Sequence, residues 1–146
     1  MRYLGKRYGY YPDDPDQAWL VDSTMDALND VINTVARIYW EKDEDRKKAM
    51  VGDFLGGTYP KFLKALSTRL EENYAAGGTF FVGSKLTVAD FLFGNFVHSL
   101  IYNELAVESA AVLKAPFEQH PALVKYAESV KSELGWYLEA RPKRAR

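Results

Sequence analysis

Three aspartates spaced four residues apart are the side chains of this chain that are best arranged for chemistry. Asp22, Asp26 and Asp30 share one face if the stretch is helical, because residues four apart in a helix are neighbours. Such a row of carboxylates can pair as acid and base, bind a hard cation or accept hydrogen bonds from an ammonium group. The plainer alternative is a solvated helix face. The same row also suits a two-fold contact in which the acids of each copy reach across the seam.

Several common kinds of active site are excluded by the residues that the chain contains. It has no cysteine, which rules out a disulfide framework and any zinc or iron–sulfur site held by thiolates. The two histidines are far apart in the sequence. His98 lies in an apolar segment, where we expect a core histidine whose ring is hydrogen-bonded. His120 precedes Pro121, where we expect a helix cap or a solvated side chain. Neither glycine-rich phosphate-binding pattern, GxxxxGK[ST] or GxGxxG, occurs. The expectation is no catalytic triad and no required metal.

Length and composition favour one globular domain with an uneven charge distribution. The 146 residues are 47% hydrophobic, which is too apolar for a disordered chain. Residues 11–30 hold six aspartates and no lysine or arginine, whereas residues 141–146 hold four basic side chains and no acid. That basic tail could contact nucleic acid, but it is short and lacks interleaved aromatics, so we expect a solvated terminus. No apolar run nears the ~20 residues of a membrane span, and we expect a cytoplasmic protein.

Helical periodicity runs through most of the sequence and predicts the elements that must position these residues. From about 15 to 42, apolar residues step by three and four, with Asp14 or Asp16 as the start signal. A charged connection is expected over 41–48. A second long helix is expected over 45–74, with a kink or break at Gly56, Gly57 and Pro60.

The second half of the chain is predicted to be helical as well. A helix that is apolar nearly all round is expected from Thr87 to about Glu104, then a loop around Pro116 and a helix from Pro121. A short last helix is expected over 136–140. No segment reads as a strand, so the predicted fold is an all-α bundle of about five to six helices.

The most specific signal in the chain is the start of the helix at Thr87. Thr87 fits the N-cap position and Asp90, three residues later, can reach back to the Thr87 amide, which makes a capping box. Leu86 before the cap and Phe91 after it fit a hydrophobic staple. These four residues are predicted to have a structural role.

At this point a family resemblance is visible. Residues 81–91 (FVGSKLTVADF) resemble the buried capping-box and staple motif of cytosolic glutathione transferases, and residues 21–30 (VDSTMDALND) resemble the start of the first helix of their C-terminal domain. The segments most similar to the sigma-like class are Thr58-Tyr59-Pro60, His120-Pro121-Ala122-Leu123 and the stretch from Trp136 to Pro142. Residues 2–9 look like the close of the last helix of the family's N-terminal domain.

The resemblance implies a division of the chain and a missing partner domain. Residues 1–9 would end the last helix of a thioredoxin-like domain, residues 10–16 would be a linker, and residues 17–146 would form the C-terminal helical domain. In the family, the thioredoxin-like domain holds most of the glutathione site and the residue that activates the thiol. No tyrosine here can be identified as that residue, so the chain is not expected to catalyse alone.

The resemblance also implies roles for particular residues. Asp30 matches the aspartate that crosses the dimer seam toward the ammonium of glutathione, the co-substrate, in the neighbouring subunit. Asp26, with Asp30, falls where some sigma-like members bind a divalent cation, but Asn29 replaces an acid there, so no metal is required. The wall of the hydrophobic substrate site would be formed by Ile32, Ala36, Leu92 and Phe96, unless these four merely pack the core.

Two functions follow from the resemblance. In the first, the chain is the helical domain of a glutathione transferase: it supplies the hydrophobic-substrate wall, a homodimer seam along the first long helix and the Asp30 contact. In the second, it is a non-catalytic docking or structural subunit of a larger protein assembly. A nucleic-acid partner or a membrane is not expected in either case.

Overall fold

The computed structural model describes residues 1–142 and 144, and all regular elements in that part of the chain are helical. Their bounds are α1 Arg2–Tyr8, α2 Pro15–Trp40, α3 Glu44–Asp53, α4 Tyr59–Ala75, α5 Val88–Phe96, α6 Val107–Glu118 and α7 Pro121–Ala140. Two π-helical turns join neighbours: η1 (Phe54–Thr58) connects α3 to α4, and η2 (Val97–Ile101) extends α5. The predicted all-α fold is confirmed.

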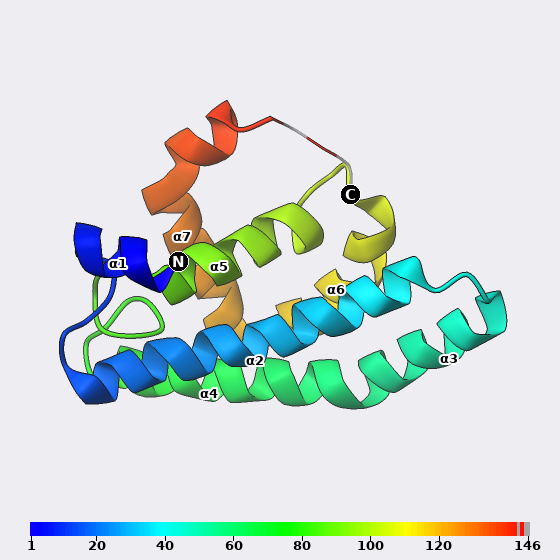
Figure 1. Cartoon of the computed structure of the whole chain (residues 1–146), viewed down its shortest axis with the longest axis horizontal. Coiled ribbons are helices and arrows are strands. Elements are labelled where there is room, and N and C mark those ends of the chain that lie inside the picture. Colours follow the sequence, from blue (N-terminus) through cyan, green and yellow to red (C-terminus); the bar gives the residue numbers. More distant parts are fainter. Residues whose placement is uncertain (143, 145–146) are drawn as a thin grey trace.

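The longest helices form an antiparallel pair. In Figure 1, α2 lies beside the rod that α3, η1 and α4 make together, and the chain runs in opposite directions along the two. α5 packs on α2, and α7 packs on both α4 and α5. One face of α2 is therefore buried and its opposite face, which carries the aspartates, is left at the surface.

The ends of the first two helices follow from local sequence. α1 ends at Gly9, whose φ of 76° lies in the left-handed region. Glycine adopts this conformation without steric cost because it has no Cβ. α2 starts because the Asp14 carboxylate accepts the Gln17 amide at 2.9 Å and Pro15 occupies the first turn. Between the two helices, the Val88 amide donates to the carbonyl of Tyr10, which ties the linker to the start of α5.

Aromatic rings fill the centre of the bundle around Phe93. The Phe93 ring centroid lies 5.2 Å from that of Phe81, 5.6 Å from Tyr126 and 5.9 Å from Phe96, with Phe117 at 6.4 Å. All five side chains are buried, and edge-on or tilted aromatic pairs add stability beyond the area they bury. This cluster joins α5 to α6, to α7 and to the loop before α5.

Three predictions about the C-terminal half differ from the structure. The loop expected around Pro116 is instead the last turn of α6, because Leu113 and Phe117 on either side of the proline are buried in the core. The expected short helix from Trp136 is the end of α7, which continues without interruption from Pro121 to Ala140. The helix that starts at Thr87 also ends sooner than expected, at Ile101 rather than Glu104.

The first half differs from expectation in two places. The run over 41–48 is only partly a connection, since α3 already begins at Glu44, where the Asp43 carboxylate accepts the Arg46 amide at 2.9 Å. The interruption expected at Gly56 and Gly57 is the π-helical turn η1, which keeps the chain helical into α4, with Pro60 in the first turn.

Two further expectations concern the surface and the tail. Among the described residues, no helix is both long and apolar enough to span a membrane. The predicted solvated basic tail includes Lys143, Ala145 and Arg146, which lie outside the described residues.

Candidate functional site

The first two aspartates of the α2 row are held by the helix before it. Arg2 of α1 places its Nε 2.7 Å from an Asp22 carboxylate oxygen and its Nη2 3.3 Å from one of Asp26. The Tyr11 hydroxyl donates to the other Asp22 oxygen at 3.0 Å. The hydrogen bond to Asp22 raises the pKa of Arg2, and partial burial followed by the Asp22 bond raises the pKa of Tyr11. Asp22 and Asp26 therefore fasten α1 to α2.

Asp30 is the member of the row that remains available. It is exposed on α2, and no donor among the described residues bonds to its carboxylate. Only its main chain is used, since the Asp30 carbonyl accepts the Thr34 hydroxyl at 2.9 Å. The carboxylate is thus free to meet a cation from outside the chain.

A metal site on this face has little support from the geometry. In residues 1–142 and 144, no three histidine, aspartate or glutamate side chains are grouped as ligands for an ion. Asp26, the candidate that the sequence paired with Asp30, already faces the Arg2 guanidinium. Asn29 is exposed and brings no charge.

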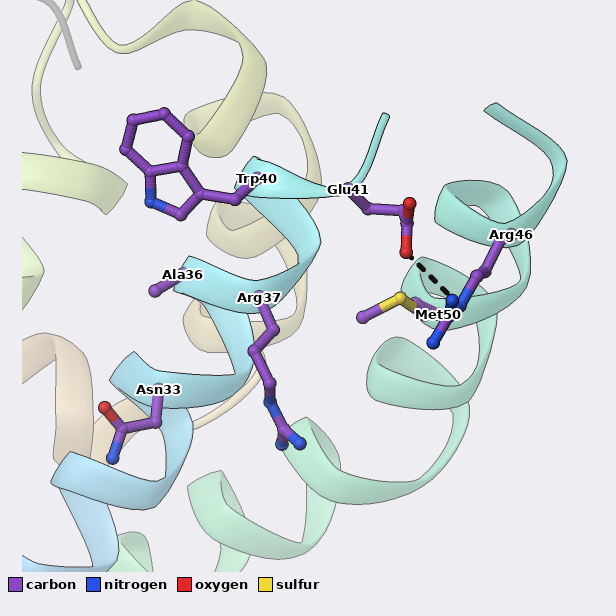
Figure 2. A pocket seen from close by; sticks show the side chains of 7 residues that line it. All are labelled: Asn33, Ala36, Arg37, Trp40, Glu41, Arg46 and Met50. Atoms are coloured by element: carbon purple, nitrogen blue, oxygen red, sulfur yellow. Dashed lines mark ion pairs between the residues drawn. The ribbon is translucent and has the colours of Figure 1, made fainter. Parts of the chain in front are cut away.

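A groove of about 640 Å³ opens at the end of α2, against the start of α3 (Figure 2). Four of its residues recur along one face of α2 and three come from the turn and α3; together they are Asn33, Ala36, Arg37, Trp40, Glu41, Arg46 and Met50. We call this set the α2–α3 groove. Across the groove, the Glu41 carboxylate forms an ion pair with Arg46, with 3.2 Å between an oxygen and the Arg46 Nε. The same carboxylate accepts hydrogen bonds from the main-chain amides of Lys42 and Asp43.

Two side chains give the α2–α3 groove its binding character. Arg37 donates from Nη2 to the Thr34 hydroxyl at 3.3 Å, and no carboxylate of the described residues lies within ion-pair distance of it. The Trp40 indole is 76% exposed and its ring meets that of Tyr39 edge to face. The groove therefore combines an open aromatic face with a guanidinium that no carboxylate of residues 1–142 and 144 pairs with.

The four residues predicted to form a substrate wall are not brought together in this groove. Ala36 is exposed and lines it. Ile32 and Leu92 are half-buried against the core. Phe96 is only 2% exposed and its ring stacks on Phe93, which makes it a core residue in this arrangement.

The capping box is present and buried. The Thr87 amide and hydroxyl both donate to Asp90 Oδ2 at 2.7 Å, and Oδ1 accepts the Phe81 amide at 3.2 Å and the Tyr126 hydroxyl at 3.1 Å. Burial raises the pKa of Asp90, and these hydrogen bonds oppose the rise. Asp90 thereby connects three separate parts of the chain.

The two staple residues have different surroundings. Leu86 is half-buried and packs against the core. Phe91 lies edge to face with Tyr10, at 4.9 Å between centroids. Phe91, the staple residue that follows the N-cap, thus also contacts the linker between α1 and α2.

A second cavity, of about 300 Å³, lies between α5 and α7 and contains His98. The ring Nε2 of His98 is 3.3 Å from the Ala127 carbonyl, and burial lowers the pKa of His98. The Arg141 guanidinium donates to the His98 carbonyl at 2.6 Å and to the Ser99 hydroxyl at 3.0 Å. As expected, His98 is a bonded, partly buried histidine. His120 occupies the N-cap position of α7, but its side chain makes no capping hydrogen bond there.

The sequence did not single out Arg2 or the aromatic and cationic residues of the α2–α3 groove. Arg2 pairs with Asp22 across twenty residues, so only the packing of α1 reveals it. A signal for the groove did exist: Asn33, Ala36, Arg37 and Trp40 are spaced by three, one and three residues, which puts them on one face of a helix.

Comparison with known proteins matches residues 29–141 to the family model described as "Glutathione S-transferase, C-terminal domain". Glutathione S-transferase 2 of Manduca sexta is 29% identical over 147 residues, which cover 98% of this chain. The chain spans 66% of that relative's length.

Two solved structures illustrate the similarity of the fold. Prostaglandin synthase D of Nilaparvata lugens superposes with a TM-score of 0.77 at 20% identity, over 97% of this chain and 65% of that one. The monomeric glutathione S-transferase Na-GST-3 of the hookworm Necator americanus gives a TM-score of 0.71 at 26% identity, over 98% and 66% of the two chains.

Proposed function

The chain belongs to the glutathione S-transferase C-terminal domain family, and we propose that it forms the helical half of an enzyme that conjugates glutathione to electrophiles. Glutathione is the co-substrate of this family. The proposed setting is the cytoplasm, where glutathione is kept mainly reduced. The proposal gives this half three tasks: a contact to glutathione through Asp30, part of the acceptor site and a subunit seam along α2.

The observation that carries the proposal is the free carboxylate of Asp30. Its two neighbours in the row are held by Arg2, whereas Asp30 meets no donor among the described residues. The γ-glutamyl end of glutathione carries an ammonium group, and a charged acceptor binds such a group more strongly than a neutral one. Asp30 would receive that ammonium from the glutathione of a neighbouring subunit.

The acceptor site is proposed to use the exposed side of α2. Ala36 lines the α2–α3 groove beside the Trp40 indole, and apolar surfaces of this kind suit an electrophile with aromatic or alkyl bulk. Ile32 and Leu92, both half-buried, remain candidates for the same wall. Phe96 is the weakest of the four, since its ring is buried in the core.

A thioredoxin-like domain is proposed to supply the thiol-activating residue and to cover α1. The short helix leaves apolar side chains in water: Tyr3 is 73% exposed, and Met1, Leu4 and Tyr8 are more than half exposed. A single short helix with an uncovered apolar surface is marginally stable unless another element packs on it. Under the proposal, residues 1–9 belong to that domain, residues 10–16 link the two and residues 17–146 alone give no conjugation.

A homodimer is proposed with α2 at the seam. The acidic part of α2, from Asp22 to Asp30, would face the neighbouring subunit, and the end of the helix that carries Arg37 would lie outside the seam. The hookworm structure described as monomeric makes this a point to measure. Analytical ultracentrifugation at several protein concentrations should detect a dimer of this chain, and a single species with the mass of one chain at every concentration would contradict the seam.

The proposed function is tested by steady-state kinetics on the protein as its gene encodes it. Asp30→Asn should raise the KM for glutathione about tenfold, because it removes one charge-assisted hydrogen bond. Asp53→Asn, the same change at an exposed position on α3, should leave that KM unaltered. Equal KM values for the two variants would remove Asp30 from the glutathione site.

A further inference from the structure

We propose that the α2–α3 groove selects acceptors that carry a carboxylate beside an aromatic or alkyl body. The inference rests on the proposed function, because it names the class of acceptor that the exposed end of α2 would take. Its physical basis lies in three residues, Arg37, Trp40 and Glu41.

Among the residues that the structure describes, the charge balance of the groove leaves Arg37 without a carboxylate partner. The ion pair between Glu41 and Arg46 is closed, with 3.2 Å between charged atoms, and Glu41 also accepts two main-chain amides. Its carboxylate is therefore committed and does not reach out to Arg37. Arg37 has only a 3.3 Å hydrogen bond to a neutral hydroxyl. The groove thus has a net positive charge that comes from Arg37.

The guanidinium of Arg37 has donors left that suit a carboxylate. The bond to Thr34 uses Nη2, so Nη1 and Nε of Arg37 stay available for donation. A guanidinium binds a carboxylate through two parallel hydrogen bonds, which fixes its orientation as well as its charge. An acceptor held in this way would place the rest of its body along α2.

The rest of the groove suits an apolar or aromatic body. Figure 2 shows the Trp40 indole extending from α2 on the side away from α3, and the Met50 thioether pointing from α3 toward the part of α2 that carries Arg37. An exposed indole offers a flat apolar face, and a thioether packs well against rings. The volume of about 640 Å³ is in the range of small-molecule sites.

Binding is measured on this chain without glutathione, using two probes that share a phenyl ring on a four-carbon chain and end in a carboxylate in one case and a neutral hydroxyl in the other. 4-Phenylbutyrate and 4-phenylbutan-1-ol are titrated separately into ¹⁵N-labelled protein at pH 7, and the indole N–H signal of Trp40, assigned with Trp40→Phe, reports the Kd. The acid should bind about fivefold more tightly than the alcohol, as expected for one solvent-accessible ion pair. Added salt should reduce that difference.

Variants assign the difference to Arg37. Arg37→Ala should lower the affinity for the acid to that for the alcohol, while Arg37→Lys should keep part of the preference, since it retains the charge but not the paired donors. Lys64→Ala removes an equal charge from an exposed position on α4 and should leave both Kd values unchanged. Far-UV circular dichroism checks that each variant is folded.

Three results would overturn the inference: equal affinity for acid and alcohol, an Arg37→Ala variant that still prefers the acid, or self-association that Arg37→Ala abolishes while the probes do not distinguish charge. The last would mean that a second copy of the chain occupies the groove. Because no turnover is measured, these results are independent of the glutathione kinetics. If the acid binds through Arg37 but Asp30→Asn leaves the KM unchanged, the groove stands and the transferase proposal fails.

Discussion

Replacing Asp90 should cost this domain a large share of its stability. The carboxylate is fully buried and accepts four hydrogen bonds, two of them from the main-chain amides of Thr87 and Phe81. Asp90→Ala leaves both amides without an acceptor, and each buried unsatisfied group costs about 1–3 kcal/mol. Relief from burying the charged carboxylate offsets part of this loss, so the expected loss is on the order of 3 kcal/mol.

Asp90→Asn provides a second, sharper comparison. The two carboxylate oxygens each accept a different main-chain amide, so an asparagine in either orientation turns its NH₂ group toward one of them. Asparagine can therefore satisfy only one amide. We expect the loss for Asp90→Asn to lie between zero and that for Asp90→Ala, at roughly half of the latter.

Urea unfolding followed by far-UV circular dichroism measures both variants. With a slope of about 2 kcal/mol per molar urea, a loss of about 3 kcal/mol lowers the midpoint by about 1.5 M. Asp43→Ala is the matched control, because Asp43 also accepts one helix-start amide at 2.9 Å but is exposed, and its loss should be about 1 kcal/mol. If Asp90→Ala is no more destabilising than Asp43→Ala, the reasoning from burial is wrong.

Three more predictions follow from contacts elsewhere in the bundle. Burial lowers the pKa of His98 below its usual 6.5, so the unfolded chain binds more protons than the folded chain as pH falls below about 6.5, and the free energy of unfolding declines there. His98→Gln should flatten that part of a pH series of urea midpoints, and an unchanged slope would contradict this. A Cβ on Gly94 would lie 2.7 Å from a Val130 methyl carbon, so Gly94→Ala should lower the free energy of unfolding by about 1–3 kcal/mol. Val130→Ala should lessen that loss in a double-mutant cycle, whereas additive losses would refute the contact. Arg2→Ala breaks two exposed ion pairs, so it should lower the free energy of unfolding by less than about 1 kcal/mol but speed amide hydrogen exchange in α1. Amide protection equal to that of the unchanged chain would be evidence that these ion pairs do not hold α1 on α2.

Local signals in the sequence predicted the elements whose stability is decided within a few residues. Asp14 before Pro15 and the Thr87–Asp90 pair are helix-start signals of this kind, and both act as expected. Gly9 ends α1 for an equally local reason, its left-handed φ. Such features depend on hydrogen bonds between residues that are close in sequence.

Where the sequence misled, packing overrode a local signal. Pro116 suggested a loop, yet the buried Leu113 and Phe117 hold the last turn of α6 around it. The separate short helix expected over 136–140 is instead the end of α7, which continues to Ala140. At Pro116 the cost of the proline is offset by the burial of the large Leu113 and Phe117 side chains.

The candidate site divides in the same way. The period of α2 predicted that its aspartates share a face, but not that Arg2 binds two of them and leaves Asp30 free. That distinction depends on how α1 packs. Gly5 allows the approach, since a Cβ there would lie 2.6 Å from a Val88 methyl carbon. The connection near residues 41–48 was expected, but the groove also required the way in which α3 packs back against α2, which no local pattern predicted.

The most direct test of the central claim couples Asp30 to the ammonium of glutathione. The KM is measured for glutathione and for its analogue without the γ-glutamyl amino group, each with the unchanged protein and with Asp30→Asn. If Asp30 receives the ammonium, the substitution should raise the KM for glutathione about tenfold and hardly change that for the analogue. A substitution that changes both KM values by the same factor would contradict the contact on which the proposed function depends.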